Sequence, residues 1–311
     1  MSELQMSISS LSCTPADKAR PWEIAVPYYA TIGTAANCNE FVTNVLRPAG
    51  FEHSGVSIHT GFVTDSNLFY HELRLDVPIT SIDAPDVNWG SLPEMLLTRP
   101  RELLDHIGWR LNSVPNQEML LERVNEGLSV MQNGSPIIRT SSEDFKNGSR
   151  LGEELIAHLR QVSGVHNIKP ILAIEIWAGH SLSQYFQLID YLRNKYGDMI
   201  ALSLDTAHVD EASGVSGEAL RILDELHRNK FDWRNSALAM IELNQPNHGL
   251  PFNDSVDQAA VIAKYGKLSR AGYLGLPPRA VIESSPTDFR ILVSDKGIAF
   301  YSDLRKSFDG D

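Results

Sequence analysis

The chain has 311 residues, with 27 Lys or Arg against 39 Asp or Glu, a formal net charge of −12. Apolar residues make up 42% and charged residues 21%, which is the mixture of a soluble globular protein. Two cysteines, Cys13 and Cys38, cannot build a four-thiolate zinc cluster or a disulfide framework, and they fit a reducing compartment. No apolar run is long enough for a membrane span, and we expect no signal peptide. These features predict a cytoplasmic protein that does not bind membranes. The acidic net charge disfavours binding to nucleic acid.

Short apolar runs of strand length alternate with longer amphipathic stretches along the chain. Residues 1–21 are polar and contain prolines, so we expect an N-terminal arm there and a single domain over residues 22–311. The predicted strands are 23–29, 55–59, 79–82, 136–140, 171–177, 199–206, 237–244 and 279–284. The predicted helices are 35–46, 93–111, 117–131, 152–162, 183–196, 216–228 and 255–268.

The last four predicted strands are dense in Ile, Leu, Val and Ala, which is typical of parallel strands buried on both faces. Seven or eight right-handed strand–helix units predict an α/β fold, specifically a (β/α)8 TIM barrel. The alternative is a doubly wound open sheet, but neither of its usual glycine-rich phosphate loops occurs. The loops within residues 60–135 are longer than a minimal barrel needs. We therefore expect an irregular N-terminal half that contains an insertion.

An acidic residue follows each of the last four apolar runs, near its C-terminal end. These residues are Glu175, Asp205, Glu242 and Glu283. In a barrel the four strand ends face one cavity, where four carboxylates repel one another unless a positive charge lies between them. The set therefore predicts a divalent metal site, for Mn, Mg, Co or Zn. The alternative is that each acid is a solvated loop residue or the N-cap of a helix.

The segment Asp205-Thr-Ala-His208 is the sharpest local signal. An Asp at a strand end and a His three residues later can reach one metal, or one metal and one substrate oxygen. The alternative is an Asp that caps the next turn beside an exposed His. Two further residues have two readings each. Arg139 could bind a phosphate or carboxylate, or form a salt bridge to one of the acids. His180 could contact substrate, or be an ordinary loop residue.

Residues 171–285 resemble the xylose isomerase-like TIM-barrel superfamily, which includes endonuclease IV and sugar epimerases of the tagatose-epimerase type. The resemblance rests on 174–179 (Ile-Glu-Ile-Trp-Ala-Gly), 204–208 (Leu-Asp-Thr-Ala-His), 242–245 (Glu-Leu-Asn-Gln), 272–275 (Gly-Tyr-Leu-Gly) and 281–283 (Val-Ile-Glu). Two departures stand out, because Glu242 and Arg139 occupy places where the family has histidines. A trinuclear zinc site like that of endonuclease IV is therefore not expected.

The resemblance implies a divalent-metal-dependent isomerase or epimerase of a sugar-like, polar small molecule. It implies that Glu175 and Glu283 each hold the metal and move a proton, that Asp205 and Glu242 complete the metal shell, and that His208 binds a substrate oxygen or adds a ligand. One alternative is an endonuclease IV-like phosphodiesterase acting on abasic DNA. The other is a catalytically degenerate barrel that serves as a binding or assembly subunit. The sequence leaves open whether the chain forms a homo-oligomer.

Overall fold

The computed structural model describes residues 23–27, 39–51, 55–59, 79–84, 86–87, 113–114, 117–131, 136–145, 149–166, 168–176, 180–243, 256–282 and 295–310. The predicted arm over residues 1–21 and the predicted helix 93–111 lie outside these residues. Most of the predicted insertion also lies outside them. The arm, this helix and the insertion therefore stay predictions. Among the described helices, none is long and apolar enough to cross a bilayer.

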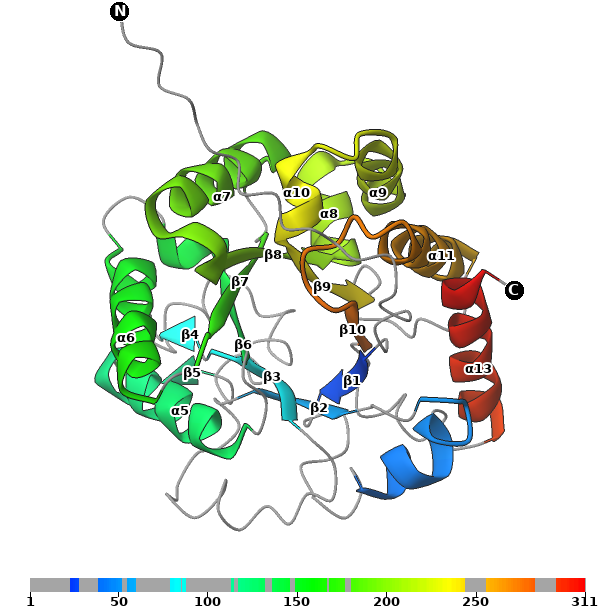
Figure 1. The fold of residues 1–311 in the computed structure, drawn as a ribbon, viewed down its shortest axis with the longest axis horizontal. Coiled ribbons are helices and arrows are strands. Elements are labelled where there is room, and N and C mark those ends of the chain that lie inside the picture. Colours follow the sequence, from blue (N-terminus) through cyan, green and yellow to red (C-terminus); the bar gives the residue numbers. More distant parts are fainter. Residues whose placement is uncertain are drawn as a thin grey trace, which may run out of the picture.

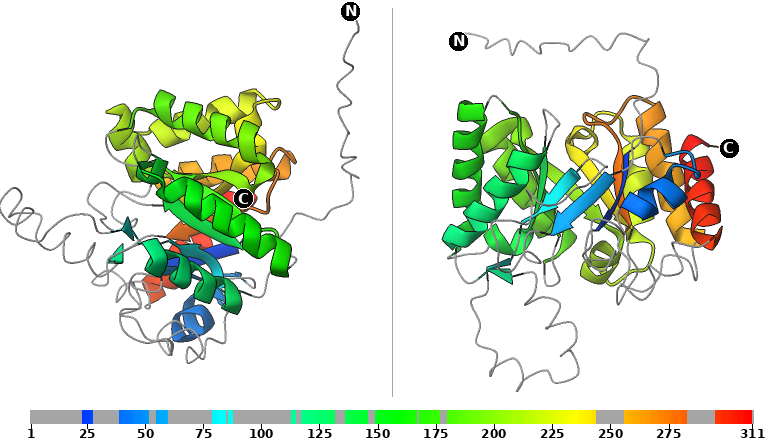
Figure 2. Two further views of the ribbon diagram at one scale, coloured as in Figure 1. Left: turned by 90° about the vertical axis from the view of Figure 1, so that its left-hand side faces the viewer. Right: turned by 90° about the horizontal axis from the view of Figure 1, so that it is seen from below.

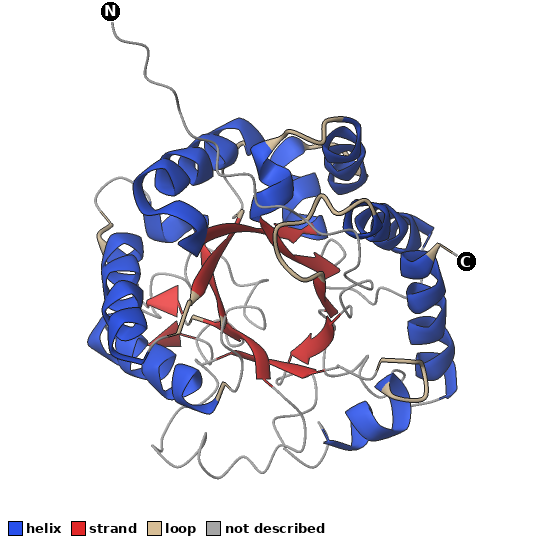
Figure 3. Cartoon of the chain, viewed as in Figure 1, coloured by secondary structure: helices blue, strands red, loops and turns tan. Residues whose placement is uncertain are grey.

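Eight parallel strands hydrogen-bond in the order β1-β10-β9-β8-β7-β6-β3-β2, and β2 pairs with β1 to close the ring (Figures 1 and 3). Their bounds are β1 Glu23–Pro27, β2 Gly55–His59, β3 Ile79–Asp83, β6 Ile137–Ser141, β7 Ile171–Glu175, β8 Ile200–Asp205, β9 Leu238–Leu243 and β10 Arg279–Ile282. Each predicted strand overlaps one of these. The α/β class and the parallel sheet are therefore confirmed, and the open-sheet alternative does not describe this ring.

Helices lie on the outside of the ring in all three views (Figures 1 and 2). Their bounds are η2 Val42–Leu46, α5 Gln117–Val130, η5 Ser142–Phe145, α6 Leu151–His166, α7 Leu182–Tyr196, η6 Gly197–Met199, α8 Thr206–Ser213, α9 Glu218–Arg228, α10 Trp233–Ala237, α11 Val256–Arg270 and α13 Asp295–Asp309. A small parallel pair, β4 Asp86–Val87 and β5 Ser113–Val114, is separate from the ring. Strand–helix alternation is continuous from β6 to β9, and the full eightfold repeat stays a prediction because several connections lie outside the described residues.

The C-terminal helix α13 joins the last part of the barrel to the first. Tyr301 on α13 packs its ring edge-on against Phe41 and Phe51, which flank η2. Arg305 donates to the backbone oxygen of Gly50 over 2.9 Å. On its other side α13 approaches α11 so closely that a Cβ at Gly266 would lie 2.0 Å from the backbone oxygen of Phe308. This helix was missed in the sequence, but its contacts help to fix the ring that carries the strand ends.

The inside of the ring is filled by a cluster that includes three alanines, Ala173, Ala201 and Ala239. Residues two apart on a strand share a face, so Glu175 continues the face of Ile171 and Ala173. By the same rule Glu242 continues the face of Met240, and Asp205 that of Ala201. The alternation therefore directs the acids at the strand ends toward the barrel mouth.

Candidate active site

Four described acids come together at the mouth: Asp83 from β3, Glu175 from β7, Asp205 from β8 and Glu242 from β9. All four are buried. Their strand positions are in register, because Asp205 pairs with Glu242 and Asp83 pairs with Arg139 across neighbouring strands. The pairing of the strands thus brings Glu175, Asp205 and Glu242 together, as the sequence predicted. Glu283, the fourth predicted acid, follows β10 directly but lies outside the described residues.

Arg139, in the middle of β6, is the cation among these acids, and it is only 7% exposed. Its Nε lies 2.6 Å from Oδ1 of Asp83. Its Nη1 forms an ion pair with Oε2 of Glu242 and lies 3.5 Å from Oε2 of Glu175. Of the two readings offered by the sequence, the structure shows the salt-bridged one, and it involves three acids.

Glu175 has a different partner on each carboxylate oxygen. Oε2 faces Arg139, and Oε1 accepts a hydrogen bond from Nδ1 of His208. Burial raises the pKa of Glu175, but the positive charge of Arg139 and the contact with His208 outweigh it and hold the pKa below its ordinary value. Glu175 is therefore ionised in the folded protein at neutral pH.

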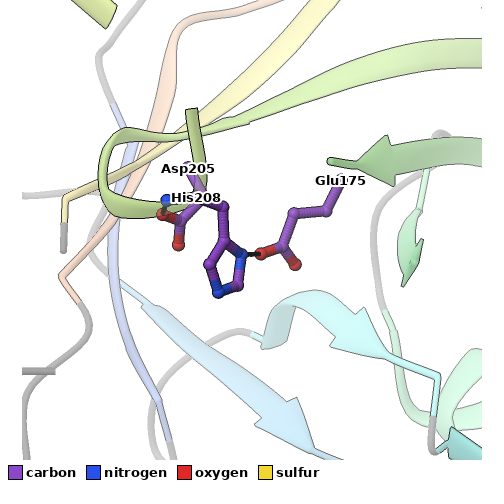
Figure 4. A group of neighbouring side chains, drawn as sticks. All are labelled: Glu175, Asp205 and His208. Carbon is purple, nitrogen blue, oxygen red and sulfur yellow. Dashed lines mark hydrogen bonds and ion pairs between the residues drawn. The ribbon is translucent and has the colours of Figure 1, made fainter. Parts of the chain in front are cut away.

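Asp205 and His208 bracket the first turn of α8. Asp205 is the N-cap of that helix and accepts from the backbone N–H of His208 over 2.8 Å, as the simpler reading of this segment proposed. The His208 side chain, however, is only 14% exposed and turns back to Glu175 (Figure 4). A proton on Nδ1 places the acceptor lone pair of the neutral ring on Nε2. One short segment thus caps a helix and supplies two polar groups to the mouth.

Glu242 is held by two groups of the protein. Oε1 accepts a hydrogen bond from the hydroxyl of Ser203, and Oε2 forms the ion pair with Arg139. Its role as a metal ligand stays a prediction, and both of its oxygens, like those of Glu175, have partners in the protein. Ser203 and Asp83 were not singled out in the sequence. The signal for Ser203 was its place two residues before Asp205 on β8, which puts both on one face.

Tyr185 on α7 supports the two strands that carry Glu175 and Asp205. Its hydroxyl donates toward the backbone oxygens of Ile174 at 2.6 Å and Ser203 at 3.1 Å. Burial, and then the charge of Glu175, raises the pKa of Tyr185 well above its ordinary value, so the hydroxyl keeps its proton. A helix side chain thereby ties together the ends of β7 and β8, just below the acids.

His180 is fixed at the neighbouring strand end, where its Nδ1 is 2.7 Å from the hydroxyl oxygen of Ser142. Ser142 is fully buried, so this contact anchors the loop that follows β7 to the end of β6. Contact of His180 with a substrate stays a prediction. Trp177, which belongs to the 174–179 motif, lies outside the described residues.

Glu175, Asp205 and His208 fit a divalent cation. Each offers a ligand atom, and these atoms lie within 4.8 Å of one another (Figure 4). Two carboxylate oxygens and an imidazole nitrogen, with the remaining positions open, form the donor set of a catalytic metal site. The charge also fits, because Arg139 is the single guanidinium facing four acids in the described part of the mouth, which leaves an excess of negative charge.

Many solved structures match this fold, among them the following two. A xylose isomerase domain protein from Planctomyces limnophilus is 13% identical, with 94% of this chain and 100% of that chain covered and a TM-score of 0.52. The fold is that of the xylose isomerase-like barrels. L-ribulose 3-epimerase is also 13% identical, with 94% of this chain and 91% of that chain covered and a TM-score of 0.50. The predicted resemblance is therefore confirmed as a likeness of fold to xylose isomerase-like proteins.

No model of a known protein family matches the chain. No curated protein matches it either. At 13% identity the likeness to the xylose isomerase-like barrels shows the fold alone, so the chemistry has to be argued from the side chains at the mouth.

The lowered pKa of Glu175 predicts a pH-dependent contribution to stability. This contribution is fully present above the pKa of Glu in the unfolded chain, about 4.3, and is lost as pH falls through the lower folded pKa. Each unit of lowering corresponds to about 1.4 kcal/mol. In urea unfolding, Glu175→Gln should therefore cost most at pH 7, and its cost should shrink at pH 3.5.

The matched control for this measurement is Glu153→Gln. Glu153 is an exposed acid on α6 that pairs with Lys195 over 2.9 Å. Its replacement should change the free energy of unfolding by less than about 1 kcal/mol at pH 7. A cost of Glu175→Gln that is the same at pH 7 and pH 3.5 would contradict the electrostatic account of this site.

Proposed function

We propose that the protein is a divalent-metal-dependent isomerase or epimerase acting on a small, sugar-like polar substrate. The observation that carries the proposal is the grouping of Glu175, Asp205 and His208 at the ends of two adjacent strands, in a mouth with an excess of negative charge. The barrel places these groups where active sites of this architecture lie, at the C-terminal ends of the strands.

The three residues would hold the cation, and the nitrogen ligand favours Mn, Co or Zn over Mg. When bound, such a cation polarises a carbonyl and holds neighbouring oxygens of a polyol. Glu175 is ionised and sits at the mouth, so it can accept a proton from substrate carbon. We assign the complementary proton transfer to Glu283, by the resemblance, and the orientation of a substrate oxygen to His208.

A second candidate is a catalytically degenerate barrel that serves as a binding or assembly subunit. The observation that favours it is Arg139, whose guanidinium already balances part of the charge of Asp83, Glu175 and Glu242. Metal dependence separates the two candidates, because a barrel balanced by Arg139 alone has no need of a cation.

Metal binding should raise the melting temperature of the protein. A ligand that binds only the folded state at 100 times its Kd stabilises by about 2.7 kcal/mol. We expect Mn²⁺ to raise the melting temperature of chelator-treated protein and Asp205→Asn to abolish most of that rise. Asn is as good an N-cap as Asp, so this variant removes a charged ligand while keeping the cap of α8.

The control for that experiment is Asp190→Asn, an exposed acid on the outer surface of α7. This variant should show the full Mn²⁺ shift. Superimposed melting curves of the unmodified protein with chelator and with Mn²⁺ would favour the degenerate barrel.

Turnover should appear as exchange of a substrate C–H hydrogen with solvent deuterium, measured by NMR on a panel of ketoses and aldoses with Mn²⁺. Glu175→Gln and Glu283→Gln should each lower the rate by about 10²–10⁴-fold, the usual contribution of a general acid or base. Glu153→Gln should leave it unchanged.

An abasic DNA duplex should remain intact in the same buffers. A phosphodiesterase has to grip phosphates, which a chain with a net charge of −12 is poorly suited to do. Incision of that duplex that disappears with Asp205→Asn would overturn the isomerase proposal in favour of the nuclease.

A further inference from the structure

Arg139 connects acids from three different strands. Asp83 and Glu175 lie on the immediate neighbours of β6, whereas Glu242 comes from β9, on the far side of β7 and β8 in the strand order. The side chain therefore reaches over the mouth instead of pairing only with its nearest acid. It does so while 7% exposed, so this charge sits in a region with little solvent to screen it.

A guanidinium suits this position better than any other cationic side chain. Its planar group carries five N–H donors, keeps its charge at every relevant pH, and is weakly hydrated for an ion. Those donors face one oxygen each of Asp83, Glu175 and Glu242. The remaining oxygens of Glu175 and Glu242 are bonded to His208 and Ser203.

A divalent cation next to the same oxygens of Asp83 and Glu242 would meet the positive charge of Arg139. Two positive groups within a few ångströms in a buried site repel strongly. The cation-binding group comes from β7 (Glu175), the end of β8 (Asp205) and the first turn of α8 (His208), and only Glu175 belongs to both sets. Asp83 and Glu242 contact Arg139 without belonging to the cation-binding group.

We propose that Arg139 is a positioning residue. It is the built-in counter-ion of Asp83 and Glu242, and it limits the barrel mouth to one divalent cation, at Glu175, Asp205 and His208. The cation count rests on the proposed function, whereas the counter-ion role does not. Glu242 and Arg139 form an internal ion pair between β9 and β6.

Loss of Arg139 should destabilise the protein more than loss of the Glu242 carboxylate. Removing the guanidinium leaves Asp83, Glu175 and Glu242 close together without their shared cation. Removing the Glu242 carboxylate leaves Arg139 with two acids. We therefore expect Arg139→Met to lower the melting temperature in chelator far more than Glu242→Gln, and the double variant to recover part of the loss.

The test combines chelator melting curves with Mn²⁺ stoichiometry, measured by equilibrium dialysis, for the unmodified protein, Arg139→Met, Arg139→Lys, Glu242→Gln and the Arg139→Met/Glu242→Gln double variant. We expect one equivalent of Mn²⁺ in the unmodified protein, Arg139→Lys and Glu242→Gln. Arg139→Met should take up a second equivalent, and the double variant should return to one. A purely structural role for Arg139 would change stability but not this count.

Each outcome is decisive. The counter-ion role is overturned if Glu242→Gln does not reduce the destabilisation by Arg139→Met, and the limit of one cation is overturned if Arg139→Met binds no more Mn²⁺ than the unmodified protein. If Arg139→Met fails to fold, a folded double variant supports the pair and an unfolded one overturns it. If the unmodified protein binds no Mn²⁺ but the rescue occurs, the proposed function fails and the counter-ion role stands.

Discussion

Electrostatic repulsion among four buried carboxylates is the constraint on which the rest of this structure depends. Asp83, Glu175, Asp205 and Glu242 all lose most of their hydration at the barrel mouth. Buried charges are tolerated only when they are paired and hydrogen-bonded. The fold meets this requirement with Arg139 for three of the acids, and with the N-cap hydrogen bond to His208 for Asp205. Among the described residues of the mouth the acids outnumber the one guanidinium, and this supports a cation as the proposed partner.

Side chains and backbone of the barrel hold these acids in place before any ligand binds. Three alanines belong to the small apolar cluster inside the ring, and the acids follow it at the strand ends. Tyr185 ties the ends of β7 and β8 together, and Ser203 fixes one oxygen of Glu242. Because these contacts come from the protein itself, the site is preorganised, which lowers the cost of ordering it around a substrate.

The strands and the positions of the acids could be predicted from the sequence. Continuous apolar runs marked the buried parallel strands, and the strand 55–59 was predicted with the bounds that β2 has in the structure. The acids Glu175, Asp205 and Glu242 converge because strands in a barrel all end at one mouth. A salt bridge from Arg139 to one of the acids was one of two readings of the sequence, but the sequence did not say that Asp83, Glu175 and Glu242 would share this guanidinium. The helix α13 was missed, although Phe300, Tyr301, Leu304 and Phe308 form a buried stripe at helical spacing along it.

We propose that the mouth holds one divalent cation, at Glu175, Asp205 and His208, beside the guanidinium of Arg139. Anomalous X-ray diffraction from crystals grown with Mn²⁺ tests it most directly, since it places each bound metal among its ligands. The account predicts a single anomalous peak bonded to Glu175, Asp205 and His208, with Arg139 still between Asp83 and Glu242. A peak at the position of the guanidinium with Arg139 displaced, or the absence of any peak at the mouth, would contradict it.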